Sequence, residues 1–338
     1  MQENAYDVVV IGGGAAGLSA ALVLGRSRRR VLVVDAGEPR NAPAAHMQGY
    51  LSRDGMPPTE FLAAGRGELA RYGVRVARDR VTAVTPDGTG EFTLTLADGA
   101  PVHARRVVLA TGLVDELPDL PGLTERWGQD VLHCPYCHGW EVRDEAFGVL
   151  ASEPFNSHQA LLVTQWSKDV TLFLHTVRDL PDAEWERLAA AGVSVVEGAV
   201  AGLEVADDRL TGVRLADGRV FPRSVLFVAA KPVPRPGLLA TLGADTRDTP
   251  YGPYPAIDET GRTSVPGVWA VGNAASPMEQ VVNAASMGYR AGVTINAELV
   301  MADIDTAVER RRAGAFSGEA EAAVSRAVLG ERAHGLAV

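Results

Sequence analysis

The stretch that decides the fold is residues 6–17, YDVVVIGGGAAG, near the start of the chain. It begins with an apolar run typical of a buried parallel strand, and residues 18–24 follow as an apolar-periodic segment that predicts a helix. Gly12, Gly14 and Gly17 between them make the pattern G-x-G-x-x-G. In such a unit the first glycine permits the tight turn, the second lets the backbone approach a pyrophosphate, and the third lets helix and strand pack closely. The sequence therefore predicts a dinucleotide-binding fold of the α/β class.

An acidic residue supports this interpretation. Asp35 ends a second predicted strand, residues 31–34. An acid about 20 residues past the glycines binds a ribose hydroxyl in such folds. The alternative, a glycine turn without a ligand, is disfavoured because strand, helix and acid all stand in their expected places.

Composition narrows the class of protein. The chain has 338 residues, 46% of them hydrophobic, and a net charge of −10. This length favours two domains or one large one, and the negative charge argues against nucleic acid or an anionic membrane as partner. The apolar runs have the length of strands, and the first strand leaves no room for a signal peptide, so we expect a soluble, cytoplasmic protein without a membrane partner.

The second informative stretch is residues 133–141, HCPYCHGWE, which holds the only two cysteines of the chain, Cys134 and Cys137. Two cysteines cannot make a disulfide scaffold, and a zinc site is not expected from so few ligands. A C-x-x-C at a helix N-terminus lowers the thiol pKa and favours thiolate chemistry near neutral pH. We therefore predict dithiol/disulfide chemistry, with no metal, in which electrons pass between the sulfurs and a bound cofactor.

Two later segments complete a recognisable order. Residues 106–112, RVVLATG, and 267–273, GVWAVGN, each predict a strand followed by a small-residue turn, and a predicted helix runs from 280 to about 300. With the G-x-G-x-x-G and C-x-x-C patterns they resemble the low-molecular-weight thioredoxin reductase family of FAD proteins, from about residue 5 to 300.

The resemblance implies two Rossmann-like, three-layer ββα domains, the second inserted in the first. Residues 1–115 and 233–338 would form the FAD-binding domain, and residues 116–232 an inserted domain that bears the C-x-x-C. The two segments in which the chain passes between these domains are rich in proline, as linkers often are. The family also forms homodimers through the FAD domain. The resemblance further implies that FAD is held by Gly12, Gly14, Ala15, Gly17, Asp35, Arg40, Val81, Thr111, Gly112, Gly272, Asn273, Gln280 and Val281.

The resemblance assigns roles around the redox pair. Cys137 would face the flavin and Cys134 would exchange with the substrate. His138 stands where the family has an acidic residue, and a histidine near neutrality can accept a thiol proton. His133, on the other flank, is a second candidate for this base. Asn273 stands where the family has an aspartate for a ribityl hydroxyl, and an amide can both accept and donate a hydrogen bond.

The family's second nucleotide turn, for NADPH, is not recognisable. A strand at residues 147–150 leads into residues 151–156, ASEPFN, which hold no glycine. Glu153 would put negative charge where a pyrophosphate sits, and Pro154 removes a backbone donor. The basic cluster for a 2′-phosphate is reduced to residues 175–178, HTVR. Either this site is lost, or a divergent loop still binds NADPH weakly.

An intact dithiol site beside a lost NADPH turn resembles one subgroup, the FAD-dependent dithiol oxidases of gliotoxin- and holomycin-type natural-product biosynthesis. The implied function is closure of a disulfide in a small-molecule dithiol, with O2 as acceptor and H2O2 as product. The alternatives are a thioredoxin reductase-like enzyme fed by NADPH or ferredoxin, and a non-catalytic FAD protein. Two further features stay open: His46 lies near the flavin or is a packing residue, and residues 251–255 line a substrate pocket with Tyr136 and Trp140 or are ordinary loop packing.

Overall fold

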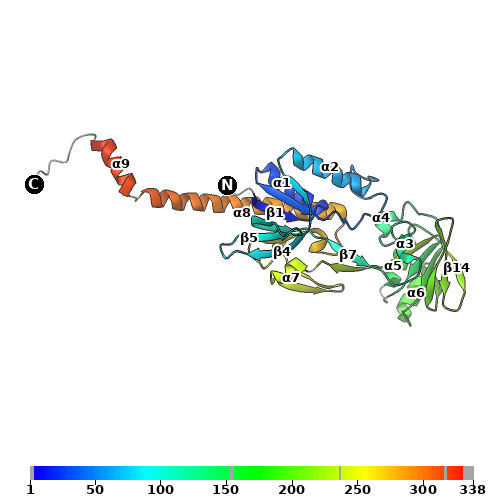
Figure 1. Cartoon of the computed structure of the whole chain (residues 1–338). Coiled ribbons are helices and arrows are strands. Elements are labelled where there is room, and N and C mark those ends of the chain that lie inside the picture. Colours follow the sequence, from blue (N-terminus) through cyan, green and yellow to red (C-terminus); the bar gives the residue numbers. More distant parts are fainter. Residues whose placement is uncertain (1–3, 153–155, 236, 316–317, 330–338) are drawn as a thin grey trace, which may run out of the picture.

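The computed structural model describes residues 4–152, 156–235, 237–315 and 318–329 (Figure 1). It is a mixed α/β structure with two Rossmann-like sheets, each built around parallel strands that helices cover. Among the described residues, every helix is too short or too polar to cross a membrane.

The first sheet has seven strands. Six follow the order β3-β2-β1-β6-β5-β4, and the seventh, β19, also pairs with β6. β1, β2, β3, β6 and β19 are parallel, whereas β4 and β5 form an antiparallel extension. Every strand predicted around the first glycine turn is therefore present and central. The strands are β1 (Ala5–Ile11), β2 (Val31–Asp35), β3 (Arg75–Arg78), β4 (Val81–Pro86), β5 (Phe92–Leu96), β6 (Pro101–Leu109) and β19 (Val268–Ala270).

One face of this sheet is covered by α1 (Ala15–Arg26), α2 (Pro58–Ala70) and α8 (Val281–Ala315). α1 and α8 cross in close contact because α8 has glycines where they meet. A Cβ added at Gly288 would lie 1.9 Å from the backbone oxygen of Ala16, and one at Gly292 would lie 2.3 Å from a methyl of Val23. The predicted helix from residue 280 thus runs well past residue 300, and in Figure 1 its orange end projects away from the body towards α9 (Gly318–Leu329).

The second sheet has five parallel strands in the order β11-β10-β9-β15-β8, with a three-stranded antiparallel sheet, β12-β13-β14, packed against it. Its strands are β8 (Val131–Leu132), β9 (Phe147–Leu150), β10 (Val170–Phe173), β11 (Ser194–Val196), β12 (Val200–Ala206), β13 (Arg209–Leu215), β14 (Val220–Pro222) and β15 (Val225–Val228). Its helices are α3 (Leu123–Arg126), α4 (Pro135–His138), α5 (Asn156–Val163) and α6 (Asp182–Ala190).

A two-stranded ribbon joins the two sheets (Figure 1). β7 (Leu113–Glu116) leaves the first sheet and β16 (Lys231–Pro234) returns to it, and the two pair antiparallel. Tyr254, on the hairpin β17 (Thr246–Thr249) and β18 (Gly252–Pro255), is fully buried and donates its hydroxyl to the oxygen of Pro232 at 3.3 Å. Two further elements follow β16 in the chain, α7 (Gly237–Thr241) and the 3-10 turn η1 (Gly272–Ala274).

Candidate flavin and dithiol site

A cavity of about 590 Å³ runs from the glycine turn of the first sheet to the C-x-x-C of the second. All the residues predicted to hold FAD line it except Gly17, as do the four predicted catalytic residues. The cavity residues come from chain segments far apart in sequence, at the carboxyl ends of β1, β2, β6 and β8 and at the start of α8. The structure therefore brings the predicted cofactor residues and the redox pair to one place.

The glycine turn has the geometry that the G-x-G-x-x-G pattern predicts. Gly12 has a φ of +110°, and a Cβ there would lie 2.2 Å from the oxygen of Ala110. A Cβ at Gly17 would lie 1.9 Å from the oxygen of Gly12, so this glycine serves helix–strand packing instead of lining the cavity. A Cβ at Gly14 would meet no described atom within 4 Å, which leaves the backbone open to a ligand.

The start of α1 fits a pyrophosphate. Gly14 is its N-cap residue, and no side chain among the described residues caps the free N–H groups of the first turn. Such a helix N-terminus faces negative charge favourably. Asp35 accepts a hydrogen bond from the backbone nitrogen of Gly13 at 3.0 Å, so one carboxylate oxygen is used to fix the turn. The donor set and the glycine cradle therefore fit the nucleotide half of a flavin dinucleotide.

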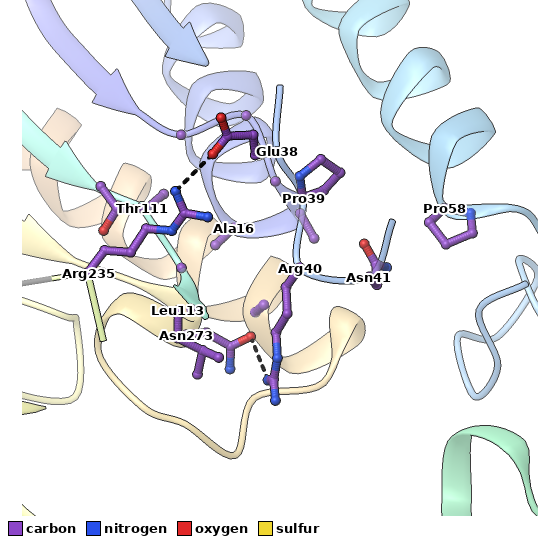
Figure 2. A pocket seen from close by; sticks show the side chains of 18 of the residues that line it. Ala16, Glu38, Pro39, Arg40, Asn41, Pro58, Thr111, Leu113, Arg235 and Asn273 are labelled. Atoms are coloured by element: carbon purple, nitrogen blue, oxygen red, sulfur yellow. Dashed lines mark hydrogen bonds and ion pairs between the residues drawn. The ribbon is translucent and has the colours of Figure 1, made fainter. Parts of the chain in front are cut away.

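The nucleotide end also carries a charged cluster that the sequence analysis missed. Glu38 forms ion pairs with Arg80 at 2.8 Å and with Arg235 at 3.3 Å, and the two arginines lower the pKa of its carboxyl. Figure 2 shows the Glu38–Arg235 pair. Arg235 Nε is buried without a hydrogen-bond partner among the described residues, so it is available to a ligand acceptor. Its position in a proline-rich linker was the available signal, but a linker pattern does not predict a cavity residue.

A second cluster joins the cavity to the ribbon between the sheets. Arg40 binds both carboxylate oxygens of Asp115, each at 2.7 Å, and Asp115 lies on β7. The third nitrogen of Arg40 donates to Asn273 Oδ1 at 3.4 Å (Figure 2). Bidentate arginine–carboxylate pairs are strong and directional. Arg40 therefore fixes the ribbon and the amide of Asn273 at once.

Asn273 also uses its donor atoms. Its Nδ2 lies 3.0 Å from the oxygen of Ser276, 3.3 Å from that of Pro277 and 3.2 Å from that of Glu279. An aspartate could not donate to these carbonyls. The amide at this position thus shapes the turn that leads to Gln280 and α8.

The redox pair is a disulfide between Cys134 and Cys137, with the two Cα atoms 5.3 Å apart. Cys134 is the N-cap residue of the short helix α4, and both sulfurs face the cavity side of that helix. Gln280 approaches both sulfurs: its Oε1 lies 3.3 Å from Cys137 Sγ, and its Nε2 lies 3.8 Å from Cys134 Sγ. Gln280 therefore reaches from the first sheet unit to the disulfide of the second.

The two histidines differ in how they are held. His133 Nδ1 lies 3.1 Å from the oxygen of Val228, and since a carbonyl only accepts, Nδ1 carries the proton and Nε2 is the free acceptor of the neutral ring. Burial lowers the pKa of His133, and Arg40 lowers it further. Burial also lowers the pKa of His138, against the carboxylate of Glu141, which raises it. Both rings are thus neutral proton acceptors at pH 7.

Part of the cavity wall is apolar and is called its apolar end here. It is made of Pro58, Phe61 and Leu62 of α2 and of Trp127, whose ring lies 6.5 Å from that of His133. Pro43, in the loop before α2, packs so tightly against Gly128 that a Cβ at Gly128 would lie 2.9 Å from the proline ring. Figure 2 shows Pro58 and Asn41 on this side of the cavity, away from Arg235. The two ends of the cavity therefore differ in polarity.

The strand expected before the second nucleotide turn is present as β9, and α5 follows the turn. Glu153 and Pro154, on which the expected loss of this site rested, lie outside the described residues. In the part that is described, the backbone N–H of Ser152 donates to Asn156 Oδ1 at 2.9 Å and is therefore engaged within the turn. His175 Nδ1 accepts a hydrogen bond from the backbone of Val200, and burial lowers its pKa, so it supplies no positive charge.

Other residues singled out from the sequence lie away from the cavity. His46 is exposed and is not one of its lining residues. Tyr254 is buried in packing, which favours the structural interpretation of residues 251–255. Tyr136 and Trp140 are 71% and 66% exposed and lie with Trp166 in a separate surface pocket on the other side of α4.

The chain resembles known proteins over most of its length. The sequence model of the pyridine nucleotide-disulphide oxidoreductase family matches residues 6–288. Thioredoxin reductase sirT of Leptosphaeria maculans is 34% identical, with 88% of this chain and 96% of that protein covered. Thioredoxin reductase tcpT of Claviceps purpurea (strain 20.1) is 32% identical, with 90% of this chain and 97% of that protein covered. The crystal structure of HlmI is 51% identical, with 92% of this chain and 97% of that chain covered and a TM-score of 0.87.

Proposed function

This chain belongs to the pyridine nucleotide-disulphide oxidoreductase family, and from that premise we propose that it is an FAD-dependent dithiol oxidase. Membership makes it a flavin-dependent thiol/disulfide oxidoreductase of the thioredoxin reductase type. The observation that carries the more specific proposal is the single cavity that joins a nucleotide cradle, a C-x-x-C disulfide and an apolar end. The net reaction is a dithiol plus O2 giving a cyclic disulfide plus H2O2.

The cysteines perform the exchange. A substrate thiolate attacks Cys134 Sγ, the Cys134–Cys137 bond breaks, and Cys137 leaves as a thiolate. The second substrate thiolate attacks the substrate sulfur of the mixed disulfide, and Cys134 leaves as a thiolate with the cyclic product released. FAD, when bound, would supply a two-electron acceptor for the cysteine pair, and O2 would be the final acceptor that gives H2O2. Gly12, Gly14, Ala15, Asp35 and the other cavity residues named above would hold it.

The histidines handle protons. His138 follows Cys137 directly and lines the cavity, and its lowered pKa keeps it an acceptor for a substrate or cysteine thiol proton at pH 7. His133 has a fixed ring whose Nε2 is free to accept. We assign His138 as the base, and His133 as the second candidate.

A small-molecule dithiol fits the apolar end better than a folded protein does. The walls there are proline, phenylalanine, leucine and tryptophan side chains, and Arg40 and Asp115, which also line the cavity, pair with each other. An uncharged substrate body therefore meets complementary surface without an unpaired buried charge. Natural-product dithiols, of the kind handled by the subgroup that the chain resembles, are candidates of this class.

The competing proposal is a reductase fed by NADPH or ferredoxin, as the names of the thioredoxin reductase relatives suggest. The engaged N–H of Ser152 and the neutral His175 count against a phosphate site at the second sheet. The two proposals predict opposite directions of electron flow.

The test is anaerobic mixing of the FAD-loaded protein with excess 1,4-dithiothreitol or with NADPH, followed at the flavin absorbance. We expect the dithiol to bleach the flavin and air to restore it with H2O2 formed, while NADPH leaves the spectrum unchanged. Bleaching by NADPH alone supports the reductase. A flavin that neither reagent bleaches contradicts the oxidase and the NADPH-fed reductase.

We also propose the division into residues 1–115 with 233–338 and residues 116–232, and a homodimer through the FAD-binding part. The domain division is supported by the β7–β16 ribbon, which connects the two parts. The homodimer is supported by apolar side chains that are exposed along α8.

A further inference from the structure

We propose that Gln280 is a catalytic residue for the disulfide and that Asn273 positions it: the Gln280 amide donates a hydrogen bond to Cys134 whenever that sulfur is a thiolate. The inference rests on the proposed dithiol chemistry of the pair. The resemblance in sequence implied only that Gln280 holds FAD, whereas its side chain here lies against both sulfurs.

The geometry gives the two ends of the amide different tasks. Nε2, 3.8 Å from Cys134 Sγ, can only donate, and Oε1, 3.3 Å from Cys137 Sγ, can only accept. In the disulfide neither sulfur carries a proton. The approach of Oε1 to Cys137 Sγ is therefore a van der Waals contact and not a hydrogen bond. Once the bond is broken, the donor at Nε2 favours a thiolate on Cys134.

This preference matters at product release. In that step the bond between the substrate sulfur and Cys134 Sγ breaks, and the electron pair stays on Cys134. A donor aimed at the leaving sulfur stabilises the developing negative charge more than it stabilises the neutral mixed disulfide. The same thiolate is the nucleophile that later attacks Cys137 Sγ to close the Cys134–Cys137 bond, any proton left on Cys137 passing to a base, and the two electrons released would go to bound FAD.

The orientation of the Gln280 side chain depends on the turn that precedes it. Gln280 lies just before the first residue of α8, and Asn273 Nδ2 holds three carbonyls of residues 276–279. Arg40 orients the amide of Asn273 through Oδ1 and is itself fixed by Asp115. These contacts form one connected series from the ribbon between the sheets to the redox sulfurs.

Other charged and titratable groups surround Cys134 and are kept constant in the test. They are His133 and His138 on its own segment, Glu141 after α4, Glu279 beside Gln280, and the Arg40–Asp115 pair, which also lines the cavity. The test therefore changes only the amide and the residue that positions it.

The experiment measures the pKa of Cys134 in the FAD-loaded Cys137→Ser variant, where it is the only thiol of the chain. The serine hydroxyl keeps a donor towards Oε1. The readout is the rate of iodoacetamide alkylation against pH. Gln280→Leu, which keeps the size and removes the amide, should raise this pKa by about one unit and slow alkylation about tenfold at pH values below both pKa values. Gln280→Glu should raise it further, because it adds a negative charge.

Asn273→Asp should raise the pKa in the same direction, since it cannot donate to the three carbonyls. Combined with Gln280→Leu it should add almost nothing, because both act through one hydrogen bond. Met278→Ala is the matched control, since Met278 belongs to the same turn and is 69% exposed, and it should leave the pKa unchanged.

An unchanged pKa in Gln280→Leu would overturn the role of Gln280, and an additive effect of Asn273→Asp would overturn the positioning role. Alkylation needs neither a dithiol substrate nor O2. If the wild-type protein fails to oxidise dithiols while the pKa shifts as expected, the proposed function is lost and this inference stands.

Discussion

At the scale of single residues, the proton acceptor is the first question. Because burial lowers the pKa of both His133 and His138, the rate of flavin reduction by a dithiol should hold steady down to about pH 6.5 and fall only below it. His138→Gln should remove this acid limb and lower the rate by about 10²-fold if His138 is the base. Stopped-flow rates between pH 5 and 8 check this prediction. An acid limb that survives in both His138→Gln and His133→Gln contradicts the assignment of either ring.

The Arg40–Asp115 pair gives a second prediction at this scale. Its side chains are 26% and 12% exposed, so Arg40→Ala leaves a largely buried carboxylate without its partner. We expect a loss of about 1–3 kcal/mol in the free energy of unfolding, less than for a fully buried pair because solvent screens part of the charge. Lys231→Ala on the same ribbon is the control, since its pair with Glu116 is exposed and should contribute less than about 0.5 kcal/mol. Urea denaturation with equal losses in the two variants would contradict the role given to Arg40.

At the scale of elements, the crossing of α1 and α8 decides whether the cofactor end of α1 is held in place. Gly288→Ala puts a methyl against the backbone oxygen of Ala16, so the helices must separate. We expect a loss of about 1–3 kcal/mol or more, together with weaker FAD retention, because Ala16 lines the cavity. Gly67→Ala, at an exposed position of α2, is the matched control. A Cβ there meets no described atom within 4 Å, so this substitution should stabilise the protein by about 0.5–1 kcal/mol. Thermal unfolding and retained flavin absorbance are the measurements, and equal melting temperatures would contradict the packing argument.

At the scale of the whole molecule, the outer face of α8 predicts association. Val293, Val300, Ile304 and Val308 are exposed at spacings that place them on one side of the helix, and the end of α8 projects from the body (Figure 1). Such a long apolar stripe is stabilised when a second copy covers it. The double variant Val300→Glu/Ile304→Glu should shift the protein from dimer to monomer in sedimentation. Val220→Glu, at an exposed apolar position on β14, should not, and a wild-type monomer would contradict the prediction.

Much of the fold was predictable because its signals are local. The glycine turn, the strands beside it and the C-x-x-C each depend on a few consecutive residues whose backbone or chemistry has few alternatives. Gly12 and Gly17 are the clearest cases, since the structure leaves no space for a Cβ at either position. Two Rossmann-like sheets and a thiol redox pair follow from such signals.

The sequence by itself determined the glycine cradle, the strands that carry it and the pair of thiols. Only the tertiary structure decided which distant side chains meet there: Arg235 with Glu38, Asp115 with Arg40, and Gln280 with the two sulfurs. These partners are separated by 75 to 197 positions, so no local pattern encodes their distance. The physical reason is that propensity and periodicity act over a few residues, whereas the meeting of side chains depends on how the ribbon and α8 pack the two sheets together.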